Sequence, residues 1–297
     1  MAYGPHPEQY INVYRPAAAG ARPVLAILVH GGFWKAKYSV DNALTREVAR
    51  ALAGIGWHVA DIEYRRVGHT GGGWPGSNAD VLAALGHIRA QLTGIVPAHT
   101  RAFRTVIFGH SAGGQLAIWA AHHAARARSE AAAMAAIAEW PSSELHDLAR
   151  CALVPDLVVA VAPVSDLLGA ARAALSDEGD AVQRYLGGDP AVDGASELAA
   201  SHASPVAACV PCALPTLVVA GGHDVDVPAE IALSYARAHG HYSSPATPAV
   251  ATLLIDSADH YSVFDGRSAP FLEVVEQANG LLRGLDEQGR RESGAEL

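Results

Sequence analysis

Short apolar runs alternate along the chain with alanine-rich stretches of helical composition. The apolar runs are rich in β-branched residues and predict buried strands, while the stretches between them predict helices. Strands are expected at residues 10–14, 23–30, 57–64, 104–109, 157–161, 215–220 and 249–255. Helices are expected at residues 41–54, with Asp41 as the N-cap, and at residues 78–93, 113–127, 228–239 and 270–283. Strands that alternate with helices predict a parallel sheet covered by helices.

The fold class expected from this order is α/β, with a mainly parallel, doubly wound sheet and helices on both faces. Residues 1–297 are expected to form one domain, without internal repeats or low-complexity linkers. Residues 10–14 alternate in polarity, which predicts an edge strand. Two less regular excursions, near residues 128–156 and 164–210, are candidate cap elements. The charged tail at residues 284–297 is expected to be frayed.

Composition and charge narrow the classes of protein that the sequence allows. Half of the 297 residues are hydrophobic, and the formal net charge is −9 with no stripe of basic residues. Nucleic-acid binding, which needs cations against phosphates, is therefore not expected. The apolar runs are shorter than the roughly 18 residues of a membrane helix, and the N-terminus lacks a signal-peptide pattern. A cytoplasmic protein without a membrane partner is expected, and its three cysteines fit a reducing compartment.

A candidate nucleophile lies between the strand at residues 104–109 and the helix at residues 113–127. Residues 109–113 read GHSAG and match the pattern G-x-S-x-G around Ser111. A sharp turn of this kind requires small residues two positions from the serine and exposes its hydroxyl at a helix N-terminus. The N–H of Ala112 then points toward an oxyanion that forms on the substrate. The alternative is a turn that contains a serine without a chemical role.

A glycine turn follows the predicted buried strand at residues 23–30. Residues 30–34 read HGGFW, and the two glycines let backbone N–H groups approach a bound acyl group closely. His30 itself is expected to shape this loop through a hydrogen bond rather than to transfer protons. The turn is therefore a second candidate source of oxyanion donors, beside the one at Ala112.

A serine hydroxyl is a weak nucleophile, so Ser111 needs a base and an acid that orients the base. The chain has 15 histidines, and strand context selects His260, five residues beyond the strand at residues 249–255. Asp224 occupies the corresponding place after the strand at residues 215–220. The carboxyl ends of parallel strands share one sheet edge, so Asp224 and His260 are expected to meet there.

Three other residues stay open as alternatives for the acid or the base. Asp226 lies two positions from Asp224, and Asp166 follows the strand at residues 157–161, so each is a rival for the acid. His223 is a rival for the base. The 36 positions between Asp224 and His260 accommodate one helix and one strand, which favours this pair.

Other patterns in the chain predict neither a cofactor nor a metal. Residues 71–76 contain G-x-G-x-x-G, but Pro75 removes a backbone N–H that a pyrophosphate would need. Cys209 and Cys212 have the spacing of a zinc half-site without a second pair, which favours buried, unreactive thiols. Two histidine pairs are expected to be solvated: His122 with His123, and His239 with His241.

Four motifs in register give the chain a resemblance to the α/β-hydrolase superfamily, in particular to the bacterial esterase and kynurenine-formamidase-like branch. They are HGGFW at residues 30–34, GHSAGG at 109–114, Asp-x-x-Val-Pro at 224–228 and Asp-His at 259–260. The resemblance covers roughly residues 9–283, and its serine, aspartate and histidine follow the chain order of that fold. HGGFW has two consecutive glycines, unlike the HGGG of hormone-sensitive-lipase-like esterases, which favours the formamidase-like side.

This resemblance implies a serine hydrolase without a cofactor, acting on a small ester or an N-formyl or aryl amide. The implied triad is Ser111, Asp224 and His260, and the implied oxyanion hole consists of Gly32, Phe33 and Ala112. Trp34, Trp74 and Tyr261 are candidate pocket residues because each lies beside a site motif, and for the two tryptophans packing in the core or at the surface is the alternative. In such proteins the tyrosine and arginine of EYRR, at residues 63–66, are structural supports.

Two other functions stay open beside this one. A peptidase of the acylaminoacyl-peptidase type would use the same groups, although such enzymes usually carry a propeller domain for which the chain has no residues. A ligand-binding protein on a hydrolase fold is the other reading, in which the serine does not react. The expected partner is a small-molecule ester or amide, and a homodimer stays open.

Overall fold

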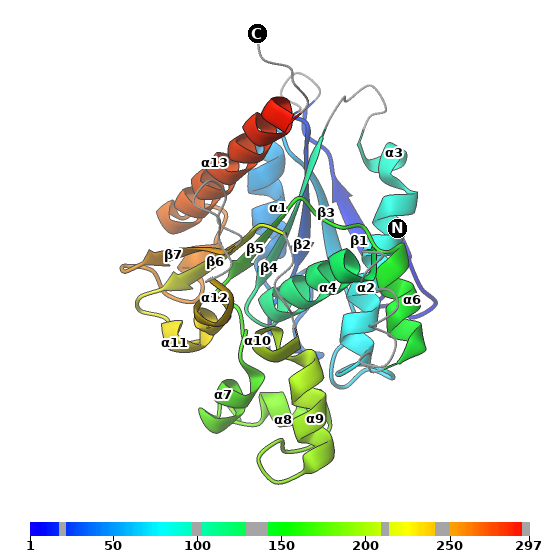
Figure 1. Cartoon of the computed structure of the whole chain (residues 1–297), viewed down its shortest axis with the longest axis vertical. Coiled ribbons are helices and arrows are strands. Elements are labelled where there is room, and N and C mark those ends of the chain that lie inside the picture. The colour runs from blue at the N-terminus through cyan, green and yellow to red at the C-terminus, as the bar shows by residue number, and fades with distance from the viewer. Residues whose placement is uncertain (18–21, 97–102, 129–141, 209–213, 241–249, 293–297) are drawn as a thin grey trace.

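One sheet of seven strands lies at the centre of the computed structural model, which describes residues 1–17, 22–96, 103–128, 142–208, 214–240 and 250–292 (Figure 1). The strands are β1 (Tyr10–Tyr14), β2 (Val24–Val29), β3 (His58–Glu63), β4 (Arg104–His110), β5 (Leu157–Val161), β6 (Thr216–Gly221) and β7 (Val250–Ile255). Their order is β1-β3-β2-β4-β5-β6-β7, with β1 antiparallel to β3 and all other neighbours parallel. The predicted α/β class, the mainly parallel sheet and the edge position of residues 10–14 are confirmed.

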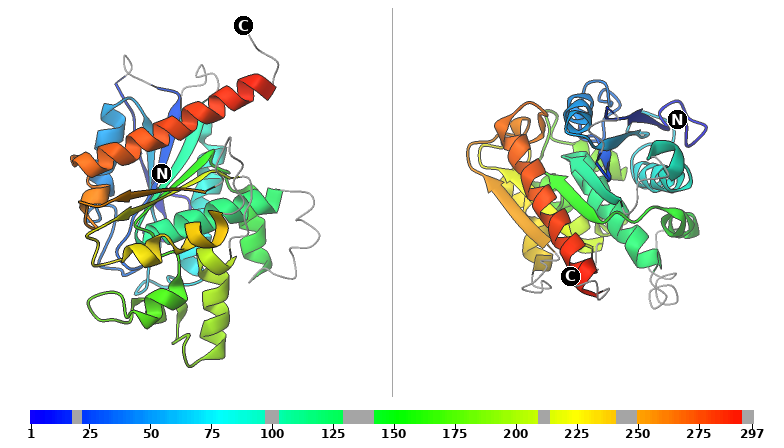
Figure 2. Two further views of the ribbon diagram at one scale, coloured as in Figure 1. Left: turned by 60° about the vertical axis from the view of Figure 1, so that its left-hand side comes forward. Right: turned by 90° about the horizontal axis from the view of Figure 1, so that it is seen from above.

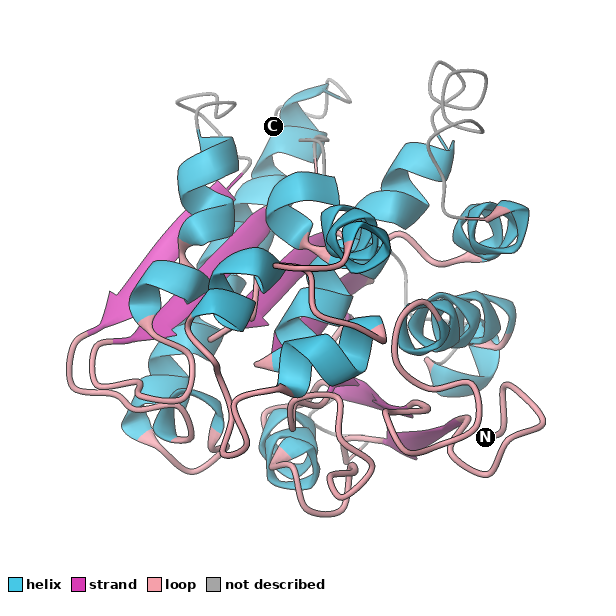
Figure 3. Cartoon of the chain, turned by 90° about the horizontal axis from the view of Figure 1, so that it is seen from below, coloured by secondary structure: helices cyan, strands magenta, loops and turns pink. Residues whose placement is uncertain are grey.

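Helices cover both faces of the sheet, as Figures 2 and 3 show from two directions. The helix α1 (Thr45–Gly54) packs on one face with α13 (Ala269–Glu292), and α2 (Gly76–Ala90) packs on the other with α4 (Ala112–Arg128). Side chains of a strand alternate between the faces, so Leu25 joins one core and Ala26 the other. The other helices are α3 (Leu92–Ile95), α6 (Ser143–Cys151), α7 (Leu167–Arg172), α8 (Ala181–Leu186), α9 (Gly194–Ala203), α10 (Pro205–Ala208), α11 (Ala229–Ala232), α12 (Ser234–His239) and the 3₁₀ turn η4 (Ser262–Phe264).

The start of α1 differs from the prediction. The helix begins at Thr45 after Leu44, whose φ of 68° is left-handed, so Asp41 is not its N-cap. The residues before it form a separate turn, in which the N–H groups of Asn42 and Ala43 donate to the carbonyl of Ser39. The carboxylate of Asp41 instead pairs with Arg46. The predicted helix at residues 228–239 is likewise divided into α11 and α12.

The frayed tail predicted from residue 284 is wrong as far as residue 292, because α13 continues to Glu292. Two contacts hold the added turns. Leu285 packs against the core on that face of the sheet, and Oδ1 of Asp286 accepts from Nε of Arg104 at 2.7 Å. Residues 293–297 lie outside the described residues. Neither α13 nor any other helix of the described ranges has the length and apolar composition that a membrane crossing requires.

The two predicted excursions have different places in the fold. In the first, α6 packs against α2 and α4 and adds a helix to the layer on that face. The expectation of a cap is therefore wrong for residues 142–156, while residues 129–141 lie outside the described residues. The second excursion contains α7 to α10, of which α7, α8 and α9 lie beyond the lower end of the sheet in Figure 1. That end carries the carboxyl ends of the parallel strands.

Asp61 is a fully buried carboxyl group on β3, and a hydrogen bond from Thr45 only partly offsets the cost of burying it. Burial raises the pKa of Asp61 well above its ordinary value. The folded protein then keeps this proton at a pH where the unfolded chain releases it. Stability is therefore lost as pH rises from about 3.9 toward the folded pKa, by about 1.4 kcal/mol for each pH unit.

The substitution Asp61→Asn, which carries no charge at any pH, tests this effect. We expect the variant to unfold several degrees higher than the wild type at pH 8 and to differ little from it at pH 4.5. Thermal unfolding followed by circular dichroism at both pH values measures the difference. An equal shift at both values would show that ionisation of Asp61 does not set the pH dependence.

Candidate active site

Ser111 lies at the sharp turn between β4 and α4, with a left-handed backbone φ of 55°. A Cβ on Gly109 would collide with the carbonyl oxygen of Gly113, and a Cβ on Gly113 would collide with that of Val29. Both positions therefore require glycine, as the sequence predicts for this turn. The N–H of Ser111 donates to the carbonyl of Val161 on β5 at 2.9 Å, which ties the turn to the sheet.

His260 and Asp224 meet at the carboxyl edge of the sheet, on the loops that follow β7 and β6. Nδ1 of His260 lies 2.7 Å from Oδ2 of Asp224, and both side chains are buried. The other carboxylate oxygen, Oδ1, accepts the N–H groups of Asp226 at 3.0 Å and Val227 at 2.8 Å. This arrangement places the proton of the imidazole on Nδ1, so Nε2 is available to accept another.

The three rivals of this pair have other positions. The carboxylate of Asp166 accepts the N–H of Gly169 at 2.9 Å and caps α7. The side chain of Asp226 lines a cavity beside Ser111 and is not the partner of His260 at Nδ1. His223 is exposed on the loop. The geometry therefore favours Asp224 as the acid and His260 as the base.

The glycine turn after β2 lies directly against the serine. A Cβ on Gly31 would come within 2.9 Å of the Cβ of Ser111. The next two residues, Gly32 and Phe33, have positive φ values of 104° and 48°. Among the described residues, the N–H groups of Gly32, Phe33 and Ala112 donate to no protein acceptor. Unpaired N–H donors beside a serine are what an oxyanion hole requires.

A cavity of about 230 Å³ opens onto Ser111 and His260. Its apolar wall includes Phe33, Ala43 and Leu44. Its polar side includes Asp177, Asp226 and Tyr261. Among its described lining residues there is no lysine or arginine, so the charged side chains that line it are the two carboxylates. Of these, Asp177 lies 3.8 Å from Nζ of Lys37, which partly offsets its charge.

The three aromatic residues predicted for the pocket have different places. Tyr261 lines the cavity and is 57% exposed. Trp34 is fully buried, with its ring stacked on Tyr185 at 4.3 Å between centroids. Trp74 packs edge-on against Trp119 at 5.7 Å between centroids. Neither Trp34 nor Trp74 is among the described residues that line this cavity, which favours a packing role for both. Trp34 is held in the core by Tyr185 on α8, whereas Trp74 is half-buried and packs against the core beside Trp119 on α4.

His110 is a site residue that the motif G-x-S-x-G leaves unspecified. Its Nε2 donates to the backbone carbonyl of His260 at 2.8 Å, and its ring stacks on Phe264 at 4.8 Å between centroids. Burial, together with the nearby His260, lowers the pKa of His110 well below its ordinary value. A neutral His110 therefore holds the loop of His260 in place without competing for the proton of Ser111.

Metal-ligating clusters are absent from the part of the chain that the structure describes, where no three His, Cys, Asp or Glu side chains are placed to hold an ion. The prediction that His122 and His123 are solvated is wrong. Both are buried, and Nε2 of His122 lies 3.0 Å from the hydroxyl of Thr216. Burial lowers the pKa of His122 to about 3 and that of His123 to about 4, so both are neutral near pH 7. Cys209, Cys212 and His241 lie outside the described residues.

Several solved structures share this fold. Inhibited esterase B from Lactobacillus rhamnosis superposes with a TM-score of 0.69 at 22% identity, over 98% of this chain and 87% of its own. A butyrate-bound esterase from Thermogutta terrifontis has a TM-score of 0.62 at 19% identity, over 93% and 88%. A bifunctional GH43-CE protein from Bacteroides eggerthii has a TM-score of 0.69 at 18% identity over 95% of this chain, which spans only 34% of that protein. The likeness establishes an α/β-hydrolase fold.

Comparison at the level of sequence identifies a family. No curated protein sequence matches the chain. The BD-FAE family matches residues 11–237, a range that contains the HGGFW and GHSAGG motifs and Asp224. Neither this match nor the solved structures test the kynurenine-formamidase branch, which stays a prediction. Because the match covers most of its length, the chain belongs to the BD-FAE family of α/β-hydrolase-type esterases.

Proposed function

We propose that this protein hydrolyses short, uncharged carboxylic esters with a triad of Ser111, His260 and Asp224. One observation carries the proposal: a serine in a strained turn, a histidine bound to a carboxylate and unpaired backbone N–H groups meet at one cavity. These are the separate requirements of acyl transfer, namely a nucleophile, an oriented base and a site for negative charge. Membership of an esterase family supports the same class of reaction.

Acylation begins when Oγ of Ser111 attacks the ester carbonyl carbon and Nε2 of His260 accepts the Oγ proton. The C=O electron pair moves onto oxygen, and the oxyanion accepts hydrogen bonds from the N–H groups of Gly32, Phe33 and Ala112. When the C=O bond re-forms, the bond to the alcohol breaks. His260 gives its proton to the leaving alcohol, and the acyl group stays on Ser111.

Deacylation repeats these steps with water as the nucleophile. His260 accepts a proton from water, the hydroxide adds to the acyl carbon, and collapse of the second oxyanion returns the proton to Oγ of Ser111. Asp224 keeps the Nδ1 proton in place and stabilises the imidazolium in both halves of the reaction. The acid leaves, and the free enzyme is regenerated.

The cavity indicates which esters fit. A volume of about 230 Å³ lies below the usual range for drug-sized ligands, which favours short acyl groups against Phe33, Ala43 and Leu44. Asp226 is a carboxylate, and so is Asp177, whose charge is partly offset by Lys37 at 3.8 Å, so a substrate with its own negative charge meets repulsion that a neutral one does not. We therefore expect uncharged esters to be preferred over anionic ones.

A substrate panel tests this function. We expect kcat/KM for 4-nitrophenyl acetate and butyrate to exceed that for the decanoate by at least about tenfold, since the cavity is small. The acetate of 3-hydroxybenzoate should react about three- to tenfold more slowly than that of 3-hydroxybenzamide, because its carboxylate approaches the two aspartates. Rates at low and high salt separate this charge effect from shape, since salt screens it.

Other outcomes of the panel would favour the alternatives. N-formylkynurenine carries an ammonium group as well as a carboxylate, so the two aspartates do not by themselves disfavour it. We expect it to react more slowly than the short esters because it is an amide and is larger than they are, while the cavity is small. A clear preference for it would establish the formamidase branch instead. Failure to hydrolyse any ester or amide of the panel would favour a ligand-binding protein and contradict the proposed function.

A further inference from the structure

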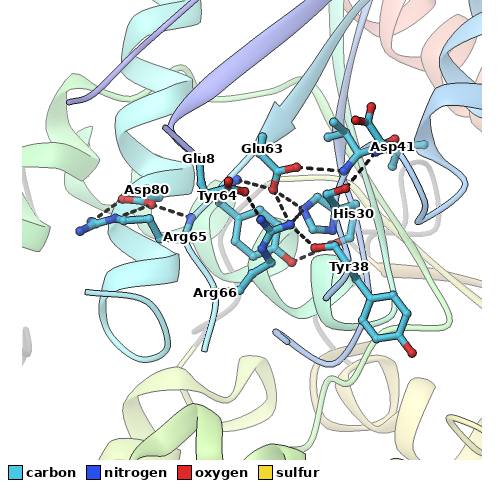
Figure 4. A network of polar contacts seen from close by, with 12 residues as sticks. Glu8, His30, Tyr38, Asp41, Glu63, Tyr64, Arg65, Arg66 and Asp80 are labelled. Atoms are coloured by element: carbon cyan, nitrogen blue, oxygen red, sulfur yellow. Dashed lines mark hydrogen bonds and ion pairs between the residues drawn. The ribbon is translucent and has the colours of Figure 1, made fainter. Parts of the chain in front are cut away.

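A network of buried polar side chains lies behind the oxyanion loop, and the proposed mechanism does not use it (Figure 4). Its centre is Glu63, the last residue of β3, with His30 and Arg66 as neighbours. The side chains of Glu63 and His30 are completely buried, and that of Arg66 is 1% exposed. Charged groups are costly to bury unless they are paired, and Glu63 pairs with both of its neighbours here.

Glu63 accepts hydrogen bonds from four groups, one of which is the N–H of the next residue, Tyr64, at 3.2 Å from Oε1. Oε1 accepts from Nε2 of His30 at 2.9 Å and pairs with Nη1 of Arg66 at 2.7 Å, while Oε2 accepts the N–H of Val40 at 2.9 Å. Burial alone would raise the pKa of Glu63, but His30, Arg66 and the Val40 N–H together bring it below its ordinary value. The group is therefore a carboxylate in the folded protein.

His30 links Glu63 to the oxyanion loop. Its other ring nitrogen, Nδ1, donates to the carbonyl oxygen of Gly31 at 2.8 Å. That carbonyl and the N–H of Gly32 belong to the same planar trans peptide unit, in which C=O and N–H point in opposite directions. A peptide held at the Gly31 oxygen thus has its Gly32 N–H fixed as well. Each ring nitrogen of His30 thus lies within hydrogen-bond distance of an oxygen, Nε2 near Oε1 of Glu63 and Nδ1 near the carbonyl oxygen of Gly31.

Through Arg66, Glu63 also fixes Tyr38, which lines the cavity. Arg66 donates to the backbone carbonyl of Tyr38 and also pairs with Glu8. The side chain of Tyr38 packs against Gly32 so closely that a Cβ there would collide with it. The ring of His30 also stacks on Tyr64 at 4.4 Å between centroids. Two segments that border Ser111 are therefore fixed to one buried carboxylate.

We propose that Glu63 is a positioning residue for the oxyanion hole. Through His30 it fixes the peptide between Gly31 and Gly32, and through Arg66 it fixes Tyr38 against this peptide. Glu63 does not contact the substrate, so its contribution concerns the orientation of the Gly32 N–H toward developing charge. This inference rests on the proposed ester hydrolysis and adds to it a residue outside the triad.

The substitution Glu63→Gln tests the proposal. An amide of the same shape places its NH₂ either against the Val40 N–H or against Arg66 and the Tyr64 N–H, so in either orientation a donor meets a donor. We expect kcat for 4-nitrophenyl acetate to fall about 10- to 100-fold while KM changes less than about threefold, because the effect is confined to the transition state. Affinity for a short alkyl boronic acid, whose tetrahedral adduct places an oxygen in the oxyanion hole, should fall in parallel.

Asp80, which lies beside Arg65 in Figure 4, provides a matched control. Its side chain is 2% exposed and pairs with Arg65 at 2.6 Å, and it also accepts from Gln9. Asp80→Asn therefore breaks a buried carboxylate–arginine pair without touching His30. We expect this variant to unfold at a lower temperature but to keep kcat and boronic acid affinity within about threefold of the wild type.

The outcomes separate the inference from the function on which it rests. Full kcat in folded Glu63→Gln, or equal losses of kcat in it and Asp80→Asn, would overturn the positioning role while ester hydrolysis by the wild type stands. If Glu63→Gln does not fold, His30→Gln takes its place. Glutamine has one donor nitrogen where histidine has two, so when its NH₂ faces Glu63 its other polar atom is an oxygen, which cannot donate to the Gly31 carbonyl. The same loss of kcat is expected there, and its absence would refute the proposal. A wild type without esterase activity would remove the proposed function itself.

Discussion

Ser111→Ala is expected to lower kcat for 4-nitrophenyl acetate by at least about 10⁴-fold, since no other nucleophile replaces the lost hydroxyl. The fold should be unaffected, because alanine occupies less space than serine and loses no hydrogen bond of the backbone. Circular dichroism should therefore show the unfolding midpoint of the wild type. Mass spectrometry after treatment with a fluorophosphonate should find the label on Ser111 in the wild type and no label at that position in the variant.

A second substitution at this position separates chemistry from backbone strain. Ser111 has a left-handed φ of 55°, a conformation that glycine adopts without the cost borne by a residue with a Cβ. Ser111→Gly should therefore be as inactive as Ser111→Ala and unfold at a temperature no lower than that variant. Substantial hydrolysis by either variant would exclude Ser111 as the nucleophile.

The sheet was predictable because its strands carry an unbroken local signal. β2 and β5 are buried at every position, and such runs have few alternatives to a parallel sheet covered on both faces. Helix ends were less predictable, since distant contacts decide them. The last turns of α13 are polar by composition, yet Arg104 on β4 pairs with Asp286 there. Sequence spacing alone does not contain that contact.

Candidate chemistry was predictable where the chain order of strands determines which loops meet. His260 and Asp224 follow adjacent strands, and their separation of 2.7 Å realises the expected approach. Pocket residues were not predictable in this way. Trp34 follows the oxyanion glycines directly, but its indole fits a space beside Tyr185 in the core. Adjacency in sequence fixes where a backbone lies and leaves the direction of a large side chain to packing.

His110 and Glu63 represent a further kind of contribution that patterns do not reveal. His110 contacts the backbone carbonyl of His260 directly, and Glu63 reaches that of Gly31 through His30. Any residue type can supply a backbone carbonyl. A motif records the side chains that react and not the side chains that hold the peptide units around them. The two residues place a loop on either side of Ser111, so the nucleophile lies between two fixed segments.

Asp224→Asn is expected to lower kcat about 10³- to 10⁴-fold, an effect of the size seen when the acid of a serine protease triad becomes an amide. The hydrogen bonds of the Asp224 carboxylate explain why kcat should fall. Oδ1 accepts the N–H groups of Asp226 and Val227, so the amide oxygen of asparagine must take that place. The NH₂ group then faces Nδ1 of His260, which can only accept. The proton of the neutral ring moves to Nε2, where it blocks proton transfer from Ser111.

Asp226→Asn is the matched control, because it makes the same chemical change two residues away. The Asp226 side chain borders the cavity and does not contact Nδ1 of His260, so kcat for an uncharged ester should stay within about fivefold of the wild type. Rates for the acetate of 3-hydroxybenzoate should rise in this variant, since one of two carboxylates is removed. Steady-state kinetics of both variants decides between the acids: a large loss of kcat in Asp226→Asn with a small one in Asp224→Asn would reverse their roles.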